Sequence, residues 1–188
     1  MALLKKIFRG SKWIDMMPSF LKKSKTWKDI EYFDENWKDR IKTMVVYIDK
    51  NKTVMDLGCG KMWLVEYLPE GCTYIPVDYI KRNQETIVAD FNKKEYPDIK
   101  SDIAFISGCL EYLDDYRWFL STVALHSNQV ILSYCSTDHY PDIRERKNNF
   151  WVNNLSTKQV IGIFASFSYH LQHSSLFNES TSIFVFSK

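Results

Sequence analysis

The stretch TVMDLGCGKMWLVEYLP, residues Thr53–Pro69, decides the fold of this chain. It opens as a short apolar strand that ends near Asp56 and runs into a turn with Gly58 and Gly60. Glycines in such a turn let the backbone bend tightly and come close to a ligand. The dinucleotide-binding pattern G-x-G-x-x-G would have a third glycine where this chain has Trp63. The stretch therefore predicts a strand and a ligand-binding turn, but not a dinucleotide site.

Short apolar runs that resemble strands alternate with helical runs after this point. Strand, helix and strand in alternation favour a mostly parallel sheet with crossover helices. The predicted strands are Thr53–Leu57, Thr73–Val77, Thr86–Ala89, Ile103–Ile106 and Val130–Tyr134, and the predicted helices lie near Trp63–Leu68 and at Tyr116–His126. The connection between the second and third strands is too short for a regular helix.

The segments on either side of this region have patterns of their own. Residues 34–48 place their apolar side chains on one helical stripe, with Asp34 as the expected N-cap. Near the other end, Ser156 stands three residues before Gln159, which is a capping-box pattern and predicts a helix. The last two apolar runs, joined at residues 178–179, predict an antiparallel hairpin at the edge of the sheet.

Composition is that of one globular domain of 188 residues, with 45% apolar and 26% charged residues. No apolar run approaches the roughly 18 residues of a membrane span, and no signal peptide is expected. The cysteines lack metal-binding spacing, so we expect reduced thiols, no metal and a cytoplasmic location. They are Cys59, Cys72, Cys109 and Cys135.

Charge is distributed unevenly along the chain. Residues 1–28 hold eight basic residues and one acid, Asp15, a charge of +7, so the net +2 leaves −5 for the remainder. We therefore divide the chain into a basic N-terminal arm or helical cap, residues 1–34, and a body, residues 35–188. The arm could contact an anionic surface such as a membrane, and a simply solvated N-terminus is the alternative.

Three acids follow successive predicted strands: Asp56, Asp78 and Asp90, the last with Phe91 beside it. In an open α/β sheet, ligands bind outside the carboxyl ends of the strands. Asp78 is placed to accept hydrogen bonds from ribose hydroxyls, and Asp90 with Phe91 to contact a base. Carboxylates at these positions suit a nucleoside that carries a cationic or zwitterionic group. Asp56 would repel the pyrophosphate of a dinucleotide.

The motifs VMDLGCG, IPVDYI, IVADFN and DIAFISGCLEYLDD, in this order and spacing, resemble the class I S-adenosylmethionine-dependent methyltransferases, in particular the small methyltransferase-domain proteins. The resemblance covers about residues 35–188. It implies a Rossmann-like α/β fold with a mostly parallel seven-stranded sheet, an antiparallel C-terminal hairpin strand and helices on both faces. It also implies the cofactor S-adenosylmethionine and the product S-adenosylhomocysteine.

The resemblance assigns cofactor contacts to positions that match the family motifs. The residues after the first strand lie under the methionine part, those after the second hold the ribose, those after the third contact the adenine, and those after the fourth flank the sulfonium. They are Asp56, Gly58, Cys59 and Gly60; Asp78 and Tyr79; Asp90 and Phe91; and Ser107, Gly108 and Cys109.

The chain departs from the family pattern at two positions. Met62 replaces the usual glycine, and Tyr112 replaces a common histidine. We expect Met62 and Trp63 to begin the next helix and pack beneath the loop. Lys61 is placed to reach the carboxylate of the cofactor.

For catalysis, the expected base is His139, with Asp138 to orient or replace it, because they follow the fifth strand where acceptor pockets form in the family. A surface histidine beside a turn is the alternative. Tyr112, Tyr134, Arg144 and Trp151 are the expected acceptor contacts. Arg144, with Arg146 and Lys147, could bind a phosphate or carboxylate, and a solvated loop is the alternative reading of these residues.

The expected reaction is O-methylation of a small molecule such as a sugar, a phosphorylated sugar or a surface-glycan precursor, by analogy with similar small bacterial proteins in polysaccharide biosynthesis. An RNA or protein methyltransferase is one alternative, and a non-catalytic partner-binding relative is another. Nucleic acid is disfavoured because the fourth strand lacks the Asn/Asp-Pro-Pro-Tyr segment and no Pro-Cys pair is present. The identity of the acceptor and the oligomeric state do not follow from these patterns.

Overall fold

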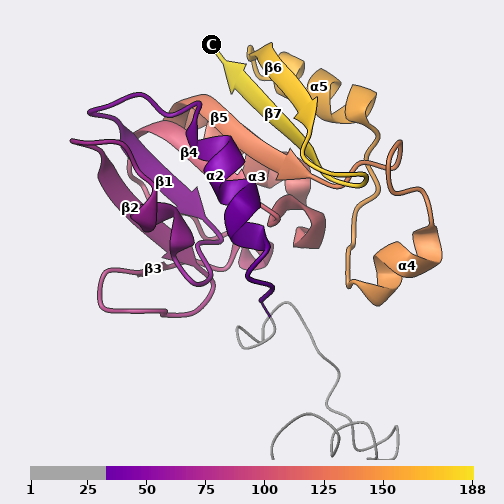
Figure 1. Ribbon diagram of the computed structural model, residues 1–188, viewed down its shortest axis with the longest axis horizontal. Coiled ribbons are helices and arrows are strands. Elements are labelled where there is room, and N and C mark those ends of the chain that lie inside the picture. Colours follow the sequence, from indigo (N-terminus) through magenta and orange to yellow (C-terminus); the bar gives the residue numbers. More distant parts are fainter. Residues whose placement is uncertain (1–32) are drawn as a thin grey trace, which may run out of the picture.

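The computed structural model describes residues 33–188, which form one seven-stranded sheet with the strand order β3-β2-β1-β4-β5-β7-β6. Figure 1 shows the sheet with β1, β4 and β5 at its centre and β6 and β7 at one edge. The strands are β1 Thr53–Leu57, β2 Thr73–Asp78, β3 Ile87–Val88, β4 Ser101–Ser107, β5 Ser127–Tyr134, β6 His170–Leu176 and β7 Ser182–Ser187. The five strands predicted in the α/β region are thus confirmed, with shifts of one to three residues at most ends.

The strand directions are those expected from the family resemblance, a mostly parallel sheet with an antiparallel C-terminal strand. The pairs among β1 to β5 are parallel, whereas β7 pairs antiparallel with both β5 and β6. β1 lies between β2 and β4, so the strand order reverses at β1. In such a sheet this reversal opens a crevice at the carboxyl ends of the strands, where ligands bind. The predicted fold class is therefore confirmed.

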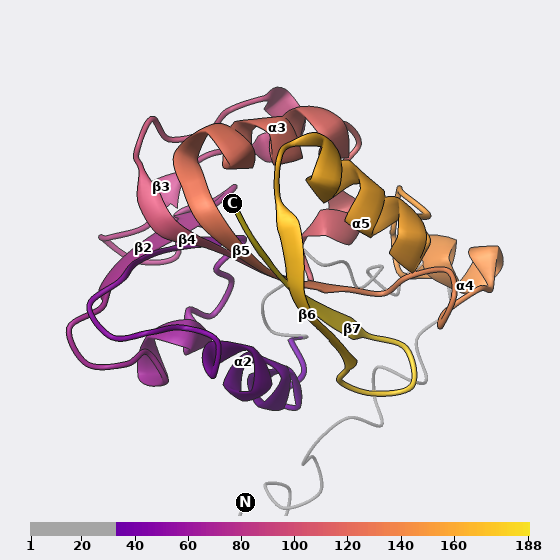
Figure 2. The same cartoon turned by 90° about the horizontal axis from the view of Figure 1, so that it is seen from above.

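Helices cover both faces of the sheet (Figure 2). α2, Trp37–Val45, and the short 3-10 helix η3, Trp63–Glu66, pack on one face through Met44, Trp63 and Leu64. α3, Tyr116–His126, and α5, Thr157–Ser166, cover the other face. Burial of these apolar side chains, at roughly 25 cal/mol per Å², is the main force that holds the layers together.

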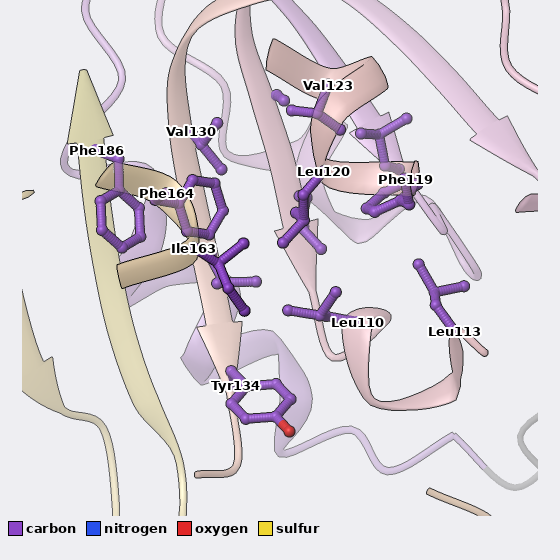
Figure 3. Close-up of a cluster of buried hydrophobic side chains, with 14 of the residues drawn as sticks. Leu110, Leu113, Phe119, Leu120, Val123, Val130, Tyr134, Ile163, Phe164 and Phe186 are labelled. Carbon is purple, nitrogen blue, oxygen red and sulfur yellow. The ribbon is translucent and has the colours of Figure 1, made fainter. Parts of the chain in front are cut away.

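The larger hydrophobic core lies between the sheet and α3 and α5 (Figure 3). Phe119 and Leu120 of α3 and Phe164 of α5 are fully or almost fully buried in it. The rings of Phe164 and Phe186 are stacked, with centroids 4.1 Å apart. The core fixes β4 and β5 under the helices, and the ends of these two strands carry much of the site described below.

Short connections replace helices at several points. η3 is a single 3-10 turn and not the longer helix expected over Trp63–Leu68. The link between β2 and β3 has no helix, as its length predicted. Two more 3-10 turns are η4, Phe91–Lys93, and η5, Leu110–Tyr112, and one further helix, α4, Ile143–Asn148, lies beyond the carboxyl end of β5 (Figure 1).

The two predicted helix caps had different outcomes. Ser156 and Gln159 form the predicted capping box of α5. The expected cap of α2 was wrong: Asn36 is the N-cap, and the Asp34 side chain instead accepts a hydrogen bond from the Asn36 backbone at 2.9 Å. The side chain of Asp34 lies too far upstream because a tight turn precedes the helix.

The C-terminal hairpin of β6 and β7 is confirmed. The basic residues of the predicted N-terminal arm fall within residues 1–32, outside the described part of the chain. No helix between residues 33 and 188 combines the length and the apolar character that crossing a membrane requires.

Candidate active site

A cleft of about 870 Å³ opens where the strand order reverses. The carboxyl ends of β1, β2 and β4 and the turns that follow them form one part of its wall. All eleven residues predicted to contact a cofactor line this cleft: Asp56, Gly58, Cys59, Gly60, Asp78, Tyr79, Asp90, Phe91, Ser107, Gly108 and Cys109. The structure therefore brings together residues that are up to 53 positions apart in sequence.

The glycine turn after β1 is held close to its neighbours. Gly58 and Gly60 have φ angles of +83° and +50°, which side chains other than glycine's adopt at a cost. A Cβ on Gly60 would lie 2.5 Å from the ring of Phe33, and one on Gly58 would lie 2.9 Å from the sulfur of Cys109. The turn therefore has no room for a side chain at either glycine.

Asp78 is held by three donors at the end of β2. Its Oδ2 accepts a hydrogen bond from the Gly60 backbone at 2.9 Å, and its Oδ1 accepts from the Ile80 backbone at 3.3 Å. Oδ1 also pairs with Nη2 of Arg82 at 3.2 Å, and both side chains are buried. Arg82 lines the cleft, and its Nε is buried without a hydrogen-bond partner among the described residues. An unsatisfied donor at this point fits a ligand with oxygen or nitrogen acceptors.

Asp56 is the second buried acid of the cleft. Its Oδ2 accepts a hydrogen bond from the hydroxyl of Tyr74 at 2.7 Å. Burial raises the pKa of Asp56 to about 7, the Tyr74 hydrogen bond lowers it, and the nearby charge of Asp78 raises it further. A cation bound beside Asp56 would favour its ionised form, so the site suits a ligand with a positive group.

The third predicted contact group has a dual role. Asp90 caps η4 through the Asn92 backbone at 3.1 Å and pairs with Lys93 at 3.4 Å. The ring of Phe91 packs against Phe119, with centroids 4.8 Å apart, and also lines the cleft. Phe91 thus belongs to the core while it presents part of its surface to the cleft.

Arg40 of α2 is a cleft residue that the sequence analysis missed. Its Nε donates to the hydroxyl of Ser107 at 3.0 Å, and its Nη2 lies 2.8 Å from where a Cβ on Gly108 would be. Lys61 also lines the cleft, but its ammonium pairs with Glu35 at 3.5 Å and lies over the ring of Trp63. No local pattern marks Arg40, because its role depends on the approach of α2 to the end of β4.

The remaining wall of the cleft is rich in aromatic and amide side chains. Two of the predicted acceptor contacts, Tyr112 and Trp151, lie in it. They are joined there by Phe150, which the sequence also placed over the acceptor, and by Tyr140, Asn148, Asn149 and Asn178, which it did not predict. We call this wall, from Tyr112 and residues 140–151 to Asn178, the acceptor wall.

Two other predicted acceptor contacts lie elsewhere. Tyr134 is fully buried, and its hydroxyl donates to Oδ1 of Asn153 at 2.7 Å. Arg144 is exposed on α4 and does not line the cleft. The side chain of Tyr134 points into the core because β5 is buried on both faces (Figure 3).

Arg146 is buried completely and holds the loop around α4 in place. It donates to the backbone carbonyls of Cys135 at 2.7 Å, Tyr140 at 3.2 Å and Asn153 at 3.1 Å. Its hydrogen-bonding capacity is thus used within the protein. The guanidinium of Arg146 is therefore not available to bind a phosphate.

The predicted base and its partner do not lie in the cleft. Asp138 and His139 line a separate small hollow with Thr157, Lys158 and Ile161. Oδ2 of Asp138 accepts a hydrogen bond from the Thr157 backbone at 2.5 Å, at the start of α5, and this bond lowers the pKa of Asp138. Sequence position after β5 could not predict the direction in which this loop turns.

A metal site is not formed by the described residues. Between residues 33 and 188, no group of three or more His, Cys, Asp or Glu side chains is arranged to hold a metal ion.

The comparisons with known proteins agree with this geometry. The model of a family described as "Methyltransferase domain" matches residues 29–181. No curated protein matches the chain.

Solved structures with the same fold include three methyltransferases. Burkholderia thailandensis 1,6-didemethyltoxoflavin-N1-methyltransferase, with its substrate and S-adenosylhomocysteine bound, is 13% identical, with a TM-score of 0.64 over 86% of this chain and 81% of its own. Synechocystis PCC 6803 magnesium protoporphyrin IX methyltransferase, with S-adenosylhomocysteine bound, is 11% identical, with a TM-score of 0.65 over 86% and 92%. A putative methyltransferase from Haloferax volcanii, in complex with the activator Trm112, is 13% identical, with a TM-score of 0.67 over 84% and 92%.

The first two of these enzymes act on chemically different substrates, and all three are at most 13% identical to this chain, so they establish the shared fold. The family match covers most of the chain, and the cleft is lined by every residue that the resemblance assigned to the cofactor. The chain therefore belongs to the methyltransferase-domain family and is a class I methyltransferase that uses S-adenosylmethionine.

Proposed function

We propose that this enzyme methylates a hydroxyl group of a small, uncharged acceptor such as a sugar. The observation that carries the proposal is the division of the cleft into an acidic part at the strand ends and an aromatic, amide-rich acceptor wall. The first part fits a sulfonium nucleoside, and the second fits a compact polar molecule with flat faces. A sugar acceptor of this kind would be consistent with a role in polysaccharide biosynthesis.

The residues present fit the cofactor in three places. Gly58 and Gly60 let the backbone after β1 bend along the cleft, where the methionine part would lie. Asp78 and the unsatisfied Nε of Arg82 offer an acceptor and a donor to the ribose. Arg40, anchored by Ser107, supplies a cation for the carboxylate of the cofactor. The sequence predicted Lys61 for this role, but Lys61 pairs with Glu35.

When bound, S-adenosylmethionine supplies a methyl group that its sulfonium already activates. The task of the protein is therefore alignment, which can contribute roughly 7–11 kcal/mol to lowering the barrier. In this proposal the turn at Gly108 and Cys109 and the acceptor wall hold the two reactants in line and exclude water. The loop from 135 to 154 is kept rigid by Arg146, which fixes the acceptor wall.

A neutral acceptor is favoured over a phosphorylated one by the cations of this region. Arg144 is exposed outside the cleft, and Arg146 is occupied by carbonyl groups of the protein. A phosphate group prefers a fork of free arginine donors, which the acceptor wall lacks among the described residues. The phosphorylated sugar of the sequence analysis is therefore the less supported acceptor.

Transfer of a radiolabelled methyl group from S-adenosylmethionine to a panel of compounds tests this proposal. The panel would contain methyl glycosides, the matching sugar phosphates and simple phenols. We expect label in one or more methyl glycosides and less in their phosphates. Label only in sugar phosphates, or only in phenols, would contradict the proposed acceptor class.

The basic segment of residues 1–28 supports RNA as a second candidate acceptor. Binding through such a segment would weaken steeply with salt, because Lys and Arg side chains release counterions from phosphates. RNA binding that is lost both at high salt and on deletion of residues 1–28, together with methylation of the bound RNA, would favour this candidate.

A further inference from the structure

Glu111 is a residue of the cleft wall that the placement of the cofactor leaves without a role. It lies in η5, three residues after the Gly108 turn at the end of β4, and is 2% exposed. Its Oε1 accepts a hydrogen bond from the Cys135 backbone at 2.9 Å, just past the end of β5. The carboxylate is thus fixed between the carboxyl ends of β4 and β5, beside the acceptor wall.

The second oxygen of this carboxylate, Oε2, is buried and has no hydrogen-bond partner among residues 33–188. Burying an acceptor without a donor is unfavourable, and more so when the group is charged. Native proteins rarely leave such an atom unsatisfied. On the wall of a ligand cleft, the missing donor is most simply a group of the bound molecule.

The other carboxylates of the cleft are engaged elsewhere or lie in solvent. Asp56 accepts from Tyr74, Asp78 is held by Gly60 and Arg82, and Asp90 caps η4. The remaining two, Asp34 and Asp39, are exposed. Among the cleft carboxylates of the described residues, Glu111 is therefore the one with a fully buried oxygen that accepts no hydrogen bond.

We propose that Glu111 accepts the proton of the acceptor's hydroxyl group during methyl transfer, an inference that rests on the proposed function. The hydroxyl oxygen forms a bond to the methyl carbon as the carbon–sulfur bond breaks, and the electron pair of that bond stays on sulfur. The O–H proton moves to Oε2 of Glu111 and then to solvent. The products are a methyl ether, S-adenosylhomocysteine and one proton.

The surroundings of Glu111 support this role. Burial raises the pKa of Glu111, which makes the carboxylate a stronger base than a glutamate in water. The charges of Arg40 from α2 and Arg146 from α4 act in the opposite sense and keep the ionised form accessible. The thiol of Cys135 and the phenol of Tyr112 face the same region, and burial raises the pKa of each to about 12. Neither group can replace Glu111 as a base near neutral pH.

An analogue of S-adenosylmethionine with an ammonium group in place of the S-methyl group tests the proposal without any acceptor. Calorimetry compares this analogue with S-adenosylhomocysteine in the wild type and in Glu111→Gln. We expect the substitution to weaken the analogue about 10-fold and to change the affinity for S-adenosylhomocysteine by less than about twofold, because the carboxylate attracts a cation at the reacting centre. Glu70→Gln, at an exposed residue outside the cleft, is the matched control and should change neither affinity.

The unmodified protein provides a second test that does not depend on the folding of Glu111→Gln. The ratio of the two affinities should rise with pH as Glu111 ionises. Asp56 also titrates in this range, so the same ratio measured in Asp56→Asn separates its contribution from that of Glu111.

Once the panel has identified an acceptor, Glu111→Gln should lower kcat by roughly 10²–10⁴-fold, the usual contribution of a general base, with the KM for the acceptor changed by less than about threefold. A ratio of affinities that is insensitive to both pH and Glu111→Gln would overturn the role of Glu111 and leave the proposed function standing. No binding of either ligand to the wild type would instead overturn the proposed function.

Discussion

Asp56 is a buried carboxyl group that couples the stability of this protein to pH. Its pKa is about 7 in the folded protein, against an ordinary value of 3.8, and the main cause is burial. The folded state therefore keeps a proton that the unfolded chain has already lost between these two pH values. The stabilising contribution is fully present below pH 3.8 and is lost as pH rises through 7.

Asp56→Asn should remove this dependence. The asparagine keeps an oxygen for the Tyr74 hydroxyl and cannot ionise, so we expect the variant to gain stability relative to the wild type as the pH increases from 5 to 8. Urea unfolding at several pH values measures the effect, with Glu70→Gln as an exposed control. A difference between variant and wild type that is the same at pH 5 and pH 8 would show that Asp56 does not titrate in this range.

Met62 occupies a position where the family usually has glycine, and its backbone conformation is one that glycine favours. Its φ angle is +59°, in the left-handed region, and its backbone donates to the Cys59 carbonyl at 2.7 Å before η3 begins. A side chain in this conformation costs about 1–2 kcal/mol, and glycine avoids the cost. The chain thus keeps a backbone shape that favours glycine, while Trp63 packs beneath the turn.

Met62→Gly and Met62→Ala form a matched pair for this strain. Both lose the half-buried side chain beyond Cβ, but only the glycine relieves the left-handed backbone. We expect the free energy of unfolding of the glycine variant to be about 1 kcal/mol higher than that of the alanine variant. Equal stabilities in denaturant titrations would mean that the turn can relax without cost.

The elements differ in how far the sequence predicts them. β1, Thr53–Leu57, and α3, Tyr116–His126, have the predicted boundaries because apolar periodicity and flanking turns are local signals. A longer helix was predicted near Trp63–Leu68, but the chain forms a single 3-10 turn there, after the left-handed Met62 and with Trp63 buried. The length of η3 is set by tertiary packing, which no local sequence pattern indicates.

The capping box of α5 makes a local prediction about stability. The hydroxyl of Ser156 accepts from the Gln159 backbone at 3.2 Å, and Oε1 of Gln159 accepts from the Ser156 backbone at 2.8 Å. Ser156→Ala should lower the free energy of unfolding by about 1 kcal/mol. Chemical unfolding measures the loss, and Lys158→Ala provides a neighbouring control at an exposed position after the cap. A loss below about 0.3 kcal/mol would contradict the role assigned to this cap.

Arg146 joins α4 and the acceptor wall to the end of β5. Its substitution should therefore affect the acceptor wall more than the cofactor side of the cleft. Arg146→Lys keeps the charge but not the planar fork of donors, and we expect it to destabilise the loop from 135 to 154. The KM for the acceptor should rise while affinity for S-adenosylhomocysteine changes by less than about threefold. Calorimetry and steady-state kinetics would detect this split, and equal losses of both would indicate a global defect.

At the scale of the whole molecule, the site was predictable where the family motifs lie at strand ends. All eleven predicted cofactor contacts meet in one cleft because parallel strands bring their carboxyl ends together. Arg40, Arg82 and Glu111 were missed because their roles depend on contacts between distant segments, such as that of Glu111 with Cys135. His139 was predicted in the cleft from its position after β5, but the following loop carries it to the start of α5.

The central claim is that this cleft binds the nucleoside of the cofactor through Asp78. Calorimetric titration of S-adenosylhomocysteine into the wild type and into Asp78→Asn tests it most directly, with thermal unfolding to confirm that the variant folds. We predict binding of one ligand per chain to the wild type and an affinity at least about 10-fold lower in the variant, since a hydrogen bond to a charged group contributes about 1.5–3 kcal/mol. No binding at millimolar ligand, or equal affinities in a folded variant, would contradict the account.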